Sequence, residues 1–192
     1  MAATRTLNQR GFTLLEVLVA LTIMAFVTLA SFEFYQAAHQ QVLAQQDISD
    51  LQLSNRNCLE EIATNLRKGG YLLDGQPPYL ISGDSLYVFF SETKPVDTVL
   101  YYLEELTDAE YSTLITGHVS GMTVYKLYKR VNSDDAVVFA DDITMLRYTV
   151  INPQLIAITL QTQAAAVDPT FTGNNGFRNF INTERVVLRN AS

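Results

Sequence analysis

The clearest candidate for chemistry in this sequence is a carboxylate inside an apolar segment. Glu16 is the only charged residue in positions 12–32, where all other residues are apolar or small and hydroxylated. A charged side chain at the centre of a membrane helix costs about 2.5–3.5 kcal/mol on insertion scales, and less near the interface. A carboxylate in such a place is therefore expected to have a function and a partner. The plain alternative is that Glu16, at the fifth position of the segment, reaches the cytoplasmic headgroups.

The two histidines, His39 and His118, do not indicate an enzyme. Neither has a Ser, Cys or acidic residue at the spacing of a known catalytic motif, and no phosphate-binding loop occurs. We expect both to be solvated histidines, and we expect no catalysis.

Two acidic pairs raise the question of a metal. Asp134-Asp135 and Asp141-Asp142 lie close together, but calcium requires six to eight oxygens from a shaped loop. The segment lacks the spacing of an EF-hand, and the strand-like AVVF at residues 136–139 separates the pairs. We expect two acidic turns on either side of a short strand and no cofactor, with calcium as the alternative.

The apolar segment is long enough to cross a membrane. Residues 12–32 would form roughly 32 Å of helix, and they contain neither Gly nor Pro. The segment is too long for the apolar region of a secretory signal peptide, and no small-x-small cleavage site follows it. Arg5 and Arg10 precede it, whereas the next basic residue is Arg56. This asymmetry predicts a cytoplasmic N-terminus and a periplasmic body.

Charge and cysteine content exclude some functions. The formal net charge is −7, and without residues 1–11 the Lys and Arg count falls from 13 to 11 against 20 acidic residues, which gives −9. A protein with this excess of negative charge repels nucleic acid, and no nucleic acid is predicted as a partner. Cys58 is the single cysteine, so no intrachain disulfide forms, and its helical context predicts a small buried residue.

The motif Gly11-Phe12-Thr13-Leu14-Leu15-Glu16, followed by an apolar helix, resembles the class III prepilin signal of type IV pilins and type II secretion pseudopilins. The resemblance implies that residues 1–11 are a leader and residues 12–34 a transmembrane helix. A prepilin peptidase would cut between Gly11 and Phe12 on the cytoplasmic face, and the new amine of Phe12 would be N-methylated.

The resemblance also implies a partner for Glu16. In this superfamily the glutamate is thought to pair with the N-terminal amine of a neighbouring subunit, here the amine of Phe12. In a medium of low dielectric constant this attraction offsets the desolvation of both charges, whereas an unpaired charge is costly. Glu16 would then disfavour a subunit that is packed out of register.

The helix is predicted to continue beyond the membrane. No Gly or Pro occurs in residues 12–68, and a helix over residues 13–67 would be about 82 Å long. Arg67 and Lys68 suit its C-terminal end, and Gly69-Gly70 stop it. An apolar stripe at spacings of three and four predicts the face, over residues 35–68, that packs on the chain's own domain; it comprises Ile48, Leu51, Asn55, Cys58, Leu59, Ile62 and Leu66. The opposite face carries Asp50, Arg56, Glu60, Thr64 and Arg67.

A β-rich head is predicted over residues 69–192. The expected strands are residues 85–91, 98–103, 123–131, 143–151, 155–161 and 183–188. A hairpin turn is expected at Asn152-Pro153-Gln154, and a bulge within residues 123–131. Residues 75–79 and 168–177 are read as loops, the second as a mobile surface loop, or alternatively as a contact surface for a partner. The fold class is α+β, similar to that of pilins: a long N-terminal helix packed against an antiparallel sheet.

The order of the strands resembles that of the larger minor pilins of the PilW type, and also that of the J-type minor pseudopilins. A cysteine pair and a helix proline, which many major pilins have, are missing. The resemblance implies a minor type IV pilin that joins other minor pilins and the major pilin in a hetero-oligomeric filament, which it initiates or caps. It would be a single-pass protein of the inner membrane before it enters the pilus. The alternatives are a minor pseudopilin at the tip of a type II secretion pseudopilus, and a membrane-anchored binding module that forms no filament.

Overall fold

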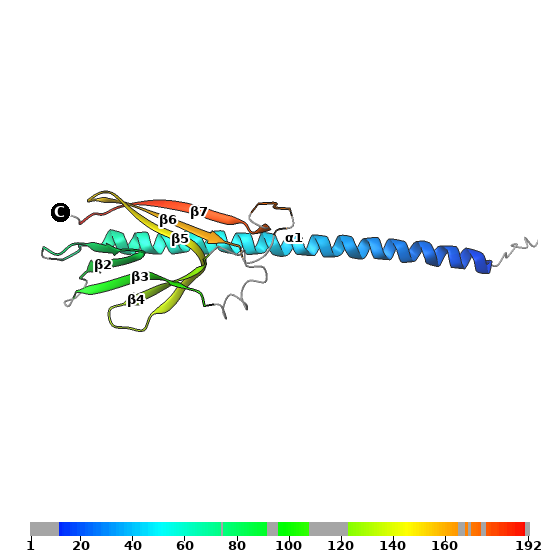
Figure 1. Cartoon of the computed structure of the whole chain (residues 1–192), viewed down its shortest axis with the longest axis horizontal. Coiled ribbons are helices and arrows are strands. Elements are labelled where there is room, and N and C mark those ends of the chain that lie inside the picture. The colour runs from blue at the N-terminus through cyan, green and yellow to red at the C-terminus, as the bar shows by residue number, and fades with distance from the viewer. Residues whose placement is uncertain are drawn as a thin grey trace, which may run out of the picture. The chain divides into compact units, whose positions relative to one another are not determined.

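The computed structural model describes residues 12–73, 75–91, 96–107, 123–164, 168, 170–173 and 176–190. These residues form one helix and seven strands (Figure 1). The elements are α1 (Leu14–Lys68), β1 (Tyr79–Ser82), β2 (Ser85–Phe90), β3 (Asp97–Glu105), β4 (Tyr125–Val131), β5 (Val137–Asn152), β6 (Leu155–Gln163) and β7 (Asn179–Val187). The chain divides into two compact units, Met1–Gln41 and Val42–Ser192.

The bounds of α1 follow from the local sequence. The helix contains no Gly or Pro, and it ends where Gly69 and Gly70 begin, within one residue of the predicted bounds. The amide of Gly69 donates to the carbonyl oxygens of Asn65 at 3.1 Å and Leu66 at 3.0 Å, and Gly70 has a φ of +82°. A glycine with positive φ just after the last turn is a common helix stop, because it avoids a clash of Cβ.

The seven strands form one antiparallel sheet in which the spatial order is the chain order, from β1 to β7. The predicted α+β fold, a long helix packed against an antiparallel sheet, is confirmed. The prediction omitted β1, which lies at one edge of the sheet and pairs with β2. The Pro77-Pro78 pair makes the start of this strand look like a loop.

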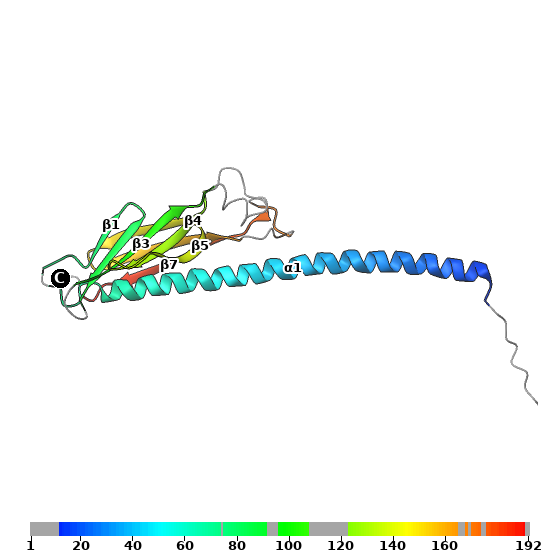
Figure 2. The same ribbon diagram turned by 90° about the horizontal axis from the view of Figure 1, so that it is seen from below.

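The hydrophobic core of the second unit lies between the C-terminal part of α1 and one face of the sheet, where the strands form one layer along the helix (Figure 2). The predicted stripe on α1 is buried except for Ile48, which is half-buried. Its partners include Leu86, Val88, Tyr101 and Leu127. Apolar residues recur every three to four residues on the helix and every two residues on the strands, and the two sets of side chains pack against each other in this core.

Strand β5 differs from the prediction. It is one strand of 16 residues, and Asp141 and Asp142 lie inside it rather than in a turn. Asp142 has a φ of +55°, and the pairing of β4 with β5 shifts register between Tyr125 and Leu127. The pairing of β4 with β5 is therefore irregular, but the extra residues lie on β5 around Asp142 and not within residues 123–131, where the bulge was predicted. Of the two expected acidic turns, only the one at Asp134 forms, where its amide donates to the carbonyl oxygen of Val131 at 3.0 Å.

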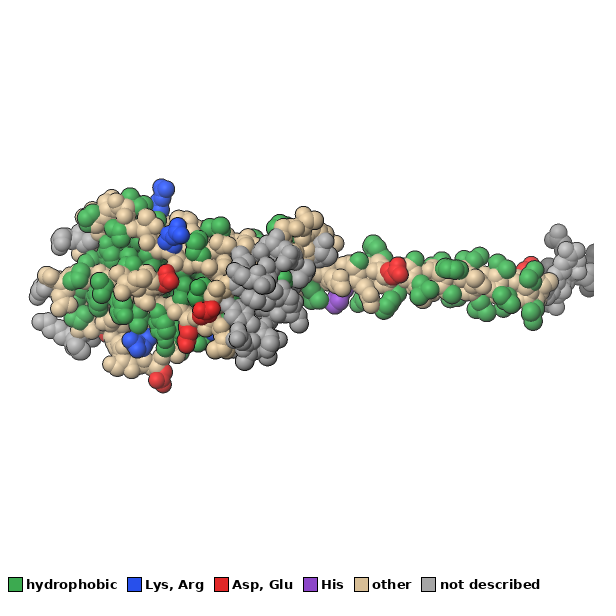
Figure 3. All heavy atoms as spheres, viewed as in Figure 1, with side chains coloured by type: hydrophobic (Ala, Val, Ile, Leu, Met, Phe, Trp, Pro, Cys, Tyr) green, Lys and Arg blue, Asp and Glu red, His purple; other side chains and the backbone are tan. Residues whose placement is uncertain are grey.

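The sheet face away from α1 carries aromatic side chains. Because Leu86, Val88 and Phe90 face the core, the alternate residues Tyr87 and Phe89 face the other way. Their rings are stacked, with centroids 6.4 Å apart, and the rings of Tyr102 and Tyr128 stack across β3 and β4 at 5.4 Å. Hydrophobic side chains gather over the strands on this face (Figure 3).

Candidate assembly site

The predicted functional residues gather at the start of α1, where Thr13 and Glu16 cap the helix. The amide and the hydroxyl of Thr13 donate to Oε2 of Glu16 at 2.8 and 2.9 Å. The amide of Glu16 donates in return to Oγ1 of Thr13 at 3.3 Å. This reciprocal pattern is a capping box, which satisfies amides that have no partner in the first turn.

The capping box uses only part of the Glu16 carboxylate. Both bonds from Thr13 reach Oε2, and among the described residues none donates to Oε1. An ionised carboxylate can accept about four hydrogen bonds, so capacity for a further donor remains. The role of Thr13 as a cap was not predicted, although a Thr followed by Glu three residues later is the sequence signature of this cap.

The hydroxyl groups in the apolar segment are satisfied by the helix itself. Thr22, Thr28 and Ser31 each donate to the carbonyl oxygen four residues earlier, at 2.8 Å in all three cases. In hydrocarbon, a polar group without a partner costs several kcal/mol. This bonding to the preceding turn removes that cost, and these residues are therefore compatible with lipid.

The apolar side chains of this segment are exposed in the structure. Phe12 is 88% exposed, Phe26 69% and Phe34 76%. The helix Leu14–Lys68 contains a window with a mean hydropathy of 2.2, and by length and composition it could cross a membrane. A continuous apolar surface of this kind requires lipid or other apolar surfaces around it.

Polar contacts join the C-terminal part of α1 to three strands. Arg67 Nη2 lies 2.9 Å from Oε1 of Glu184 on β7, and Asn65 Nδ2 donates to the hydroxyl of Tyr101 on β3 at 2.6 Å. Glu61 pairs with Lys129 on β4. Arg67, predicted on the solvated face, therefore takes part in the packing of the head.

The described part of the loop at residues 168–177 is organised around Asp168. Its Oδ1 accepts hydrogen bonds from the amide and the hydroxyl of Thr170 at 2.8 and 2.6 Å, and its Oδ2 accepts one from Arg178 Nε at 2.6 Å. The bonds from Thr170, followed by that from Arg178, lower the pKa of Asp168. The Arg178 guanidinium also lies over the ring of Phe171, 5.0 Å from its centroid. Contact of this loop with a partner stays a prediction.

Some buried groups have strongly altered acidity. Cys58 is 2% exposed, as predicted, and burial followed by the nearby Glu61 raises its pKa to about 12. Burial, with Asp141 and Asp47 nearby, raises the pKa of Asp142 to about 6. Within the described residues, no three His, Cys, Asp or Glu side chains are grouped so that they could hold a metal ion.

The remaining candidates are placed as follows. His39 is exposed, and its ring stacks on Tyr35 with centroids 6.1 Å apart. Gly11 and His118 lie outside the described residues, as does the leader at residues 1–11. The structure therefore brings Phe12 and Glu16 to the same helix end, and it leaves the position of Gly11 as a prediction.

Comparison with known families gives a match at the N-terminal end of the chain. The prokaryotic N-terminal methylation motif matches residues 6–32, a range that includes Gly11, Phe12 and Glu16. This motif indicates a type IV pilin or pseudopilin, and it points to a structural protein rather than an enzyme. No curated protein and no solved structure matches the chain.

Proposed function

We propose that this chain is a minor type IV pilin, made as a prepilin and anchored in the inner membrane, which initiates or caps the pilus together with other minor pilins. The observation that carries the proposal is the methylation motif at residues 6–32, which includes the first part of the apolar helix α1 with its exposed side chains. A prepilin motif implies processing by prepilin peptidase and assembly with other pilins.

The first step is processing. Prepilin peptidase cuts between Gly11 and Phe12, and the new amine of Phe12 is then methylated. Phe12 precedes the first helical residue, Leu14, and its side chain is 88% exposed. The position of Phe12 outside the helix and its exposed side chain support access by a peptidase. Residues 1–11 are thereby removed, and residues 12–34 remain as the membrane anchor.

The second step is the formation of a charge pair between subunits. The positive amine of Phe12 in one subunit approaches Glu16 of its neighbour. The capping box supports this role, because Thr13 fixes the carboxylate while Oε1 accepts no hydrogen bond from the described residues. Removal of one partner from a buried ion pair costs about 3–5 kcal/mol, so a subunit in the wrong register is strongly disfavoured.

The apolar surface of α1 supplies the rest of the attraction. The exposed residues between Phe12 and Tyr35 leave lipid for the surfaces of neighbouring helices, in a filament with the major pilin and other minor pilins. The absence of Pro from Leu14–Lys68 and the single cysteine of the sequence favour a minor over a major subunit, by comparison with the pattern of many major pilins.

A minor pseudopilin of the J type, at the tip of a type II secretion pseudopilus, is the second candidate. The matched motif is common to pilins and pseudopilins, so it supports both candidates equally. Both candidates share the cleavage, the methylation and the charge pair, and they differ in what the filament does.

Two experiments test the proposal. Mass spectrometry of the mature protein is expected to show an N-terminus at methylated Phe12, whereas an intact Met1 product would contradict assembly as a pilin. Deletion of the gene is then expected to abolish surface pili and twitching motility. Loss of protein secretion with normal pili would instead establish the pseudopilin.

A further inference from the structure

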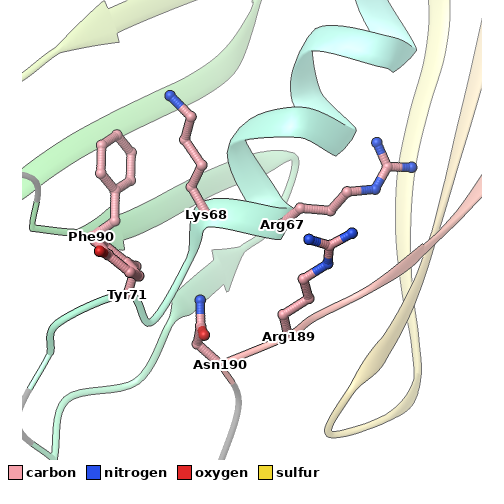
Figure 4. A pocket seen from close by; sticks show the side chains of 6 residues that line it. All are labelled: Arg67, Lys68, Tyr71, Phe90, Arg189 and Asn190. Carbon is pink, nitrogen blue, oxygen red and sulfur yellow. The ribbon is translucent and has the colours of Figure 1, made fainter.

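A pocket of about 620 Å³ lies in the second unit at the C-terminal end of α1, where the helix meets the end of β2 and the segment after β7 (Figure 4). Its lining consists of Arg67, Lys68, Tyr71, Phe90, Arg189 and Asn190. Sites for small molecules commonly have volumes of about 300–1,000 Å³, so this pocket is large enough to hold a ligand.

The charge of this pocket is opposite to that of its surroundings. Residues 42–192 contain 11 basic and 18 acidic side chains, yet three of the basic ones line this pocket and none of its described lining residues is acidic. Like charges that line one pocket repel one another. Arg67 and Lys68 have an ordinary explanation, because basic residues suit the negative end of a helix.

Arg189 has no such explanation. It follows β7, more than a hundred residues from the helix end, and its side chain lies on the same side of the pocket as that of Arg67 (Figure 4). Among the described residues Arg189 makes no ion pair, whereas Arg67 is bound to Glu184 at 2.9 Å. Figure 4 shows the Arg189 guanidinium beside that of Arg67, while Lys68 lines the same pocket on the side of Phe90. This arrangement indicates a site for a negative group.

The frame of the pocket is fixed by the backbone. The amide of Gly70 donates to the carbonyl oxygen of Phe89, and the amide of Ser91 donates to that of Tyr71, both at 2.9 Å. A Cβ at Gly70 would lie only 2.6 Å from the carbonyl oxygen of Asn190, so the segment that carries Arg189 sits directly on the glycine turn. The backbone that carries the cations is therefore fixed before a ligand arrives, which reduces the entropy lost on binding.

We propose that this pocket binds a compact oxyanion, a carboxylate or phosphate group carried on an apolar or ring-shaped body. The planar guanidinium of Arg189 matches two oxygens of such a group, and Lys68 adds a compact charge. Lys68 Nζ lies 5.6 Å from the centroid of the Phe90 ring, so a cation and an aromatic surface are side by side. Tyr71 and Phe90 provide the wall for the body of the ligand.

The acidic side chains of the head favour a ligand with a single negative group over a long polyanion. A long polyanion such as DNA is repelled by the excess of acidic side chains in residues 42–192, whereas a single charged group enters the pocket alone. The group can come from a free small acid or from an acidic side chain of a partner protein. This inference does not depend on the proposed function, because it concerns the head and not the N-terminal motif.

The test is calorimetric titration of the full chain in a neutral detergent. The probes are phenyl phosphate, benzoate, and two blocked peptides of sequence Gly-Tyr-Glu-Gly and Gly-Tyr-Gln-Gly. We expect saturable binding of one ligand per chain that weakens as salt is added. Tighter binding of the small acids identifies a free ligand. Tighter binding of the Glu peptide, with none by its Gln counterpart, identifies a side chain from a partner.

Variants locate the binding. Arg189→Gln is expected to weaken binding about tenfold or more, as the loss of a charged hydrogen-bond donor predicts. Lys68→Gln is a second, independent test. Arg185→Gln is the matched control, because Arg185 is exposed on β7 and does not line the pocket. Absence of saturable binding to every probe, or equal affinity in the Arg189 and Arg185 variants, would overturn the proposal.

Discussion

Thr13 and Glu16 bond to each other across the first turn of α1, with two hydrogen bonds from Thr13 to Oε2 of Glu16 and one returned to the Thr13 hydroxyl. A residue that the sequence presents as a charge in an apolar segment is thus also a helix cap. The two properties can be separated by substitution, because Gln also completes a capping box.

Glu16→Gln keeps the cap and removes the charge. We expect this variant to be cleaved and inserted normally but to enter filaments poorly, because the amine of Phe12 in the neighbour loses its partner. The measurement is the share of the protein in sheared, pelleted filaments. Glu33→Gln, which changes the other carboxylate of the apolar helix, is the control and is expected to assemble normally. Normal assembly of Glu16→Gln would assign the residue to capping alone.

Thr13→Ala keeps the charge and weakens the cap. It removes two of the three hydrogen bonds, and losses of this kind cost about 0.5–2 kcal/mol of helix stability. We expect a fall in filament incorporation of about fivefold, which corresponds to ~1 kcal/mol. Thr13→Ser preserves the hydroxyl and is expected to behave as the wild type. Equal incorporation of the Ala and Ser variants would show that the cap has no part in assembly.

Cys58 is expected to resist thiol reagents in the folded protein. Its pKa is raised from 9.0 to about 12 by burial and by Glu61, so only about one thiol in ten thousand is ionised at pH 8. Because the folded pKa is the higher one, this contribution to stability is complete below pH 9 and is lost as the pH rises towards 12. Labelling followed by mass spectrometry is expected to require denaturant. Rapid labelling of the native chain would show that the helix and the sheet separate readily.

Asp142→Asn is expected to stabilise the head at neutral pH. Burial raises the pKa of Asp142 from 3.8 to about 6, so its contribution to stability is present below about pH 4 and is lost as the pH rises through 6. Replacement by a neutral amide is expected to increase the free energy of unfolding at pH 7 by roughly 1–3 kcal/mol. Asn also tolerates the φ of +55° at this position.

The measurement is thermal unfolding of the two proteins at pH 4 and pH 7 in the same detergent. The difference in melting temperature is expected to be larger at pH 7 than at pH 4. Asp134→Asn, in the exposed turn that follows β4, is the control and is expected to change neither value. A gain that is equal at both pH values would rule out ionisation of Asp142 as its cause.

Gly70→Ala is expected to destabilise the head more than Gly75→Ala. Both glycines have positive φ, +82° and +73°, so both substitutions carry backbone strain of about 1–2 kcal/mol. A Cβ at Gly70 would also meet Asn190, whereas nothing lies within 4 Å of a Cβ at Gly75. The difference between the two melting temperatures therefore measures the close approach of the segment after β7. Equal losses would show that this segment moves away without cost.

Much of the fold follows from local sequence patterns. The stripe from Leu51 to Leu66 predicts which face of α1 is buried, and the Gly69-Gly70 pair predicts its end within one residue. The extension of β5 through Asp141 and Asp142 was not predicted. Acidic pairs favour turns, and the competing requirement here is the pairing of the strand with β4 and β6.

The candidate sites also differ in whether a local sequence pattern predicts them. The Thr13 cap has a local signature, so the sequence contains enough information to find it. The pocket at Arg67 and Arg189 has no local signature. Its residues are far apart in the sequence, and they meet only when the sheet is complete. A contact between distant segments leaves no trace in a single sequence.

The strand order β1 to β7 has a consequence for how the head folds. Each strand pairs with its predecessor in the chain, across connections that range from two residues between β5 and β6 to 19 residues between β3 and β4. Each step in building the sheet therefore joins segments that are near neighbours in the sequence. The contact of Arg67 with Glu184 is different, because it spans 117 residues and waits for β7, the last strand to arrive. That ion pair therefore requires β7 to be in place, and it marks a head whose sheet is complete.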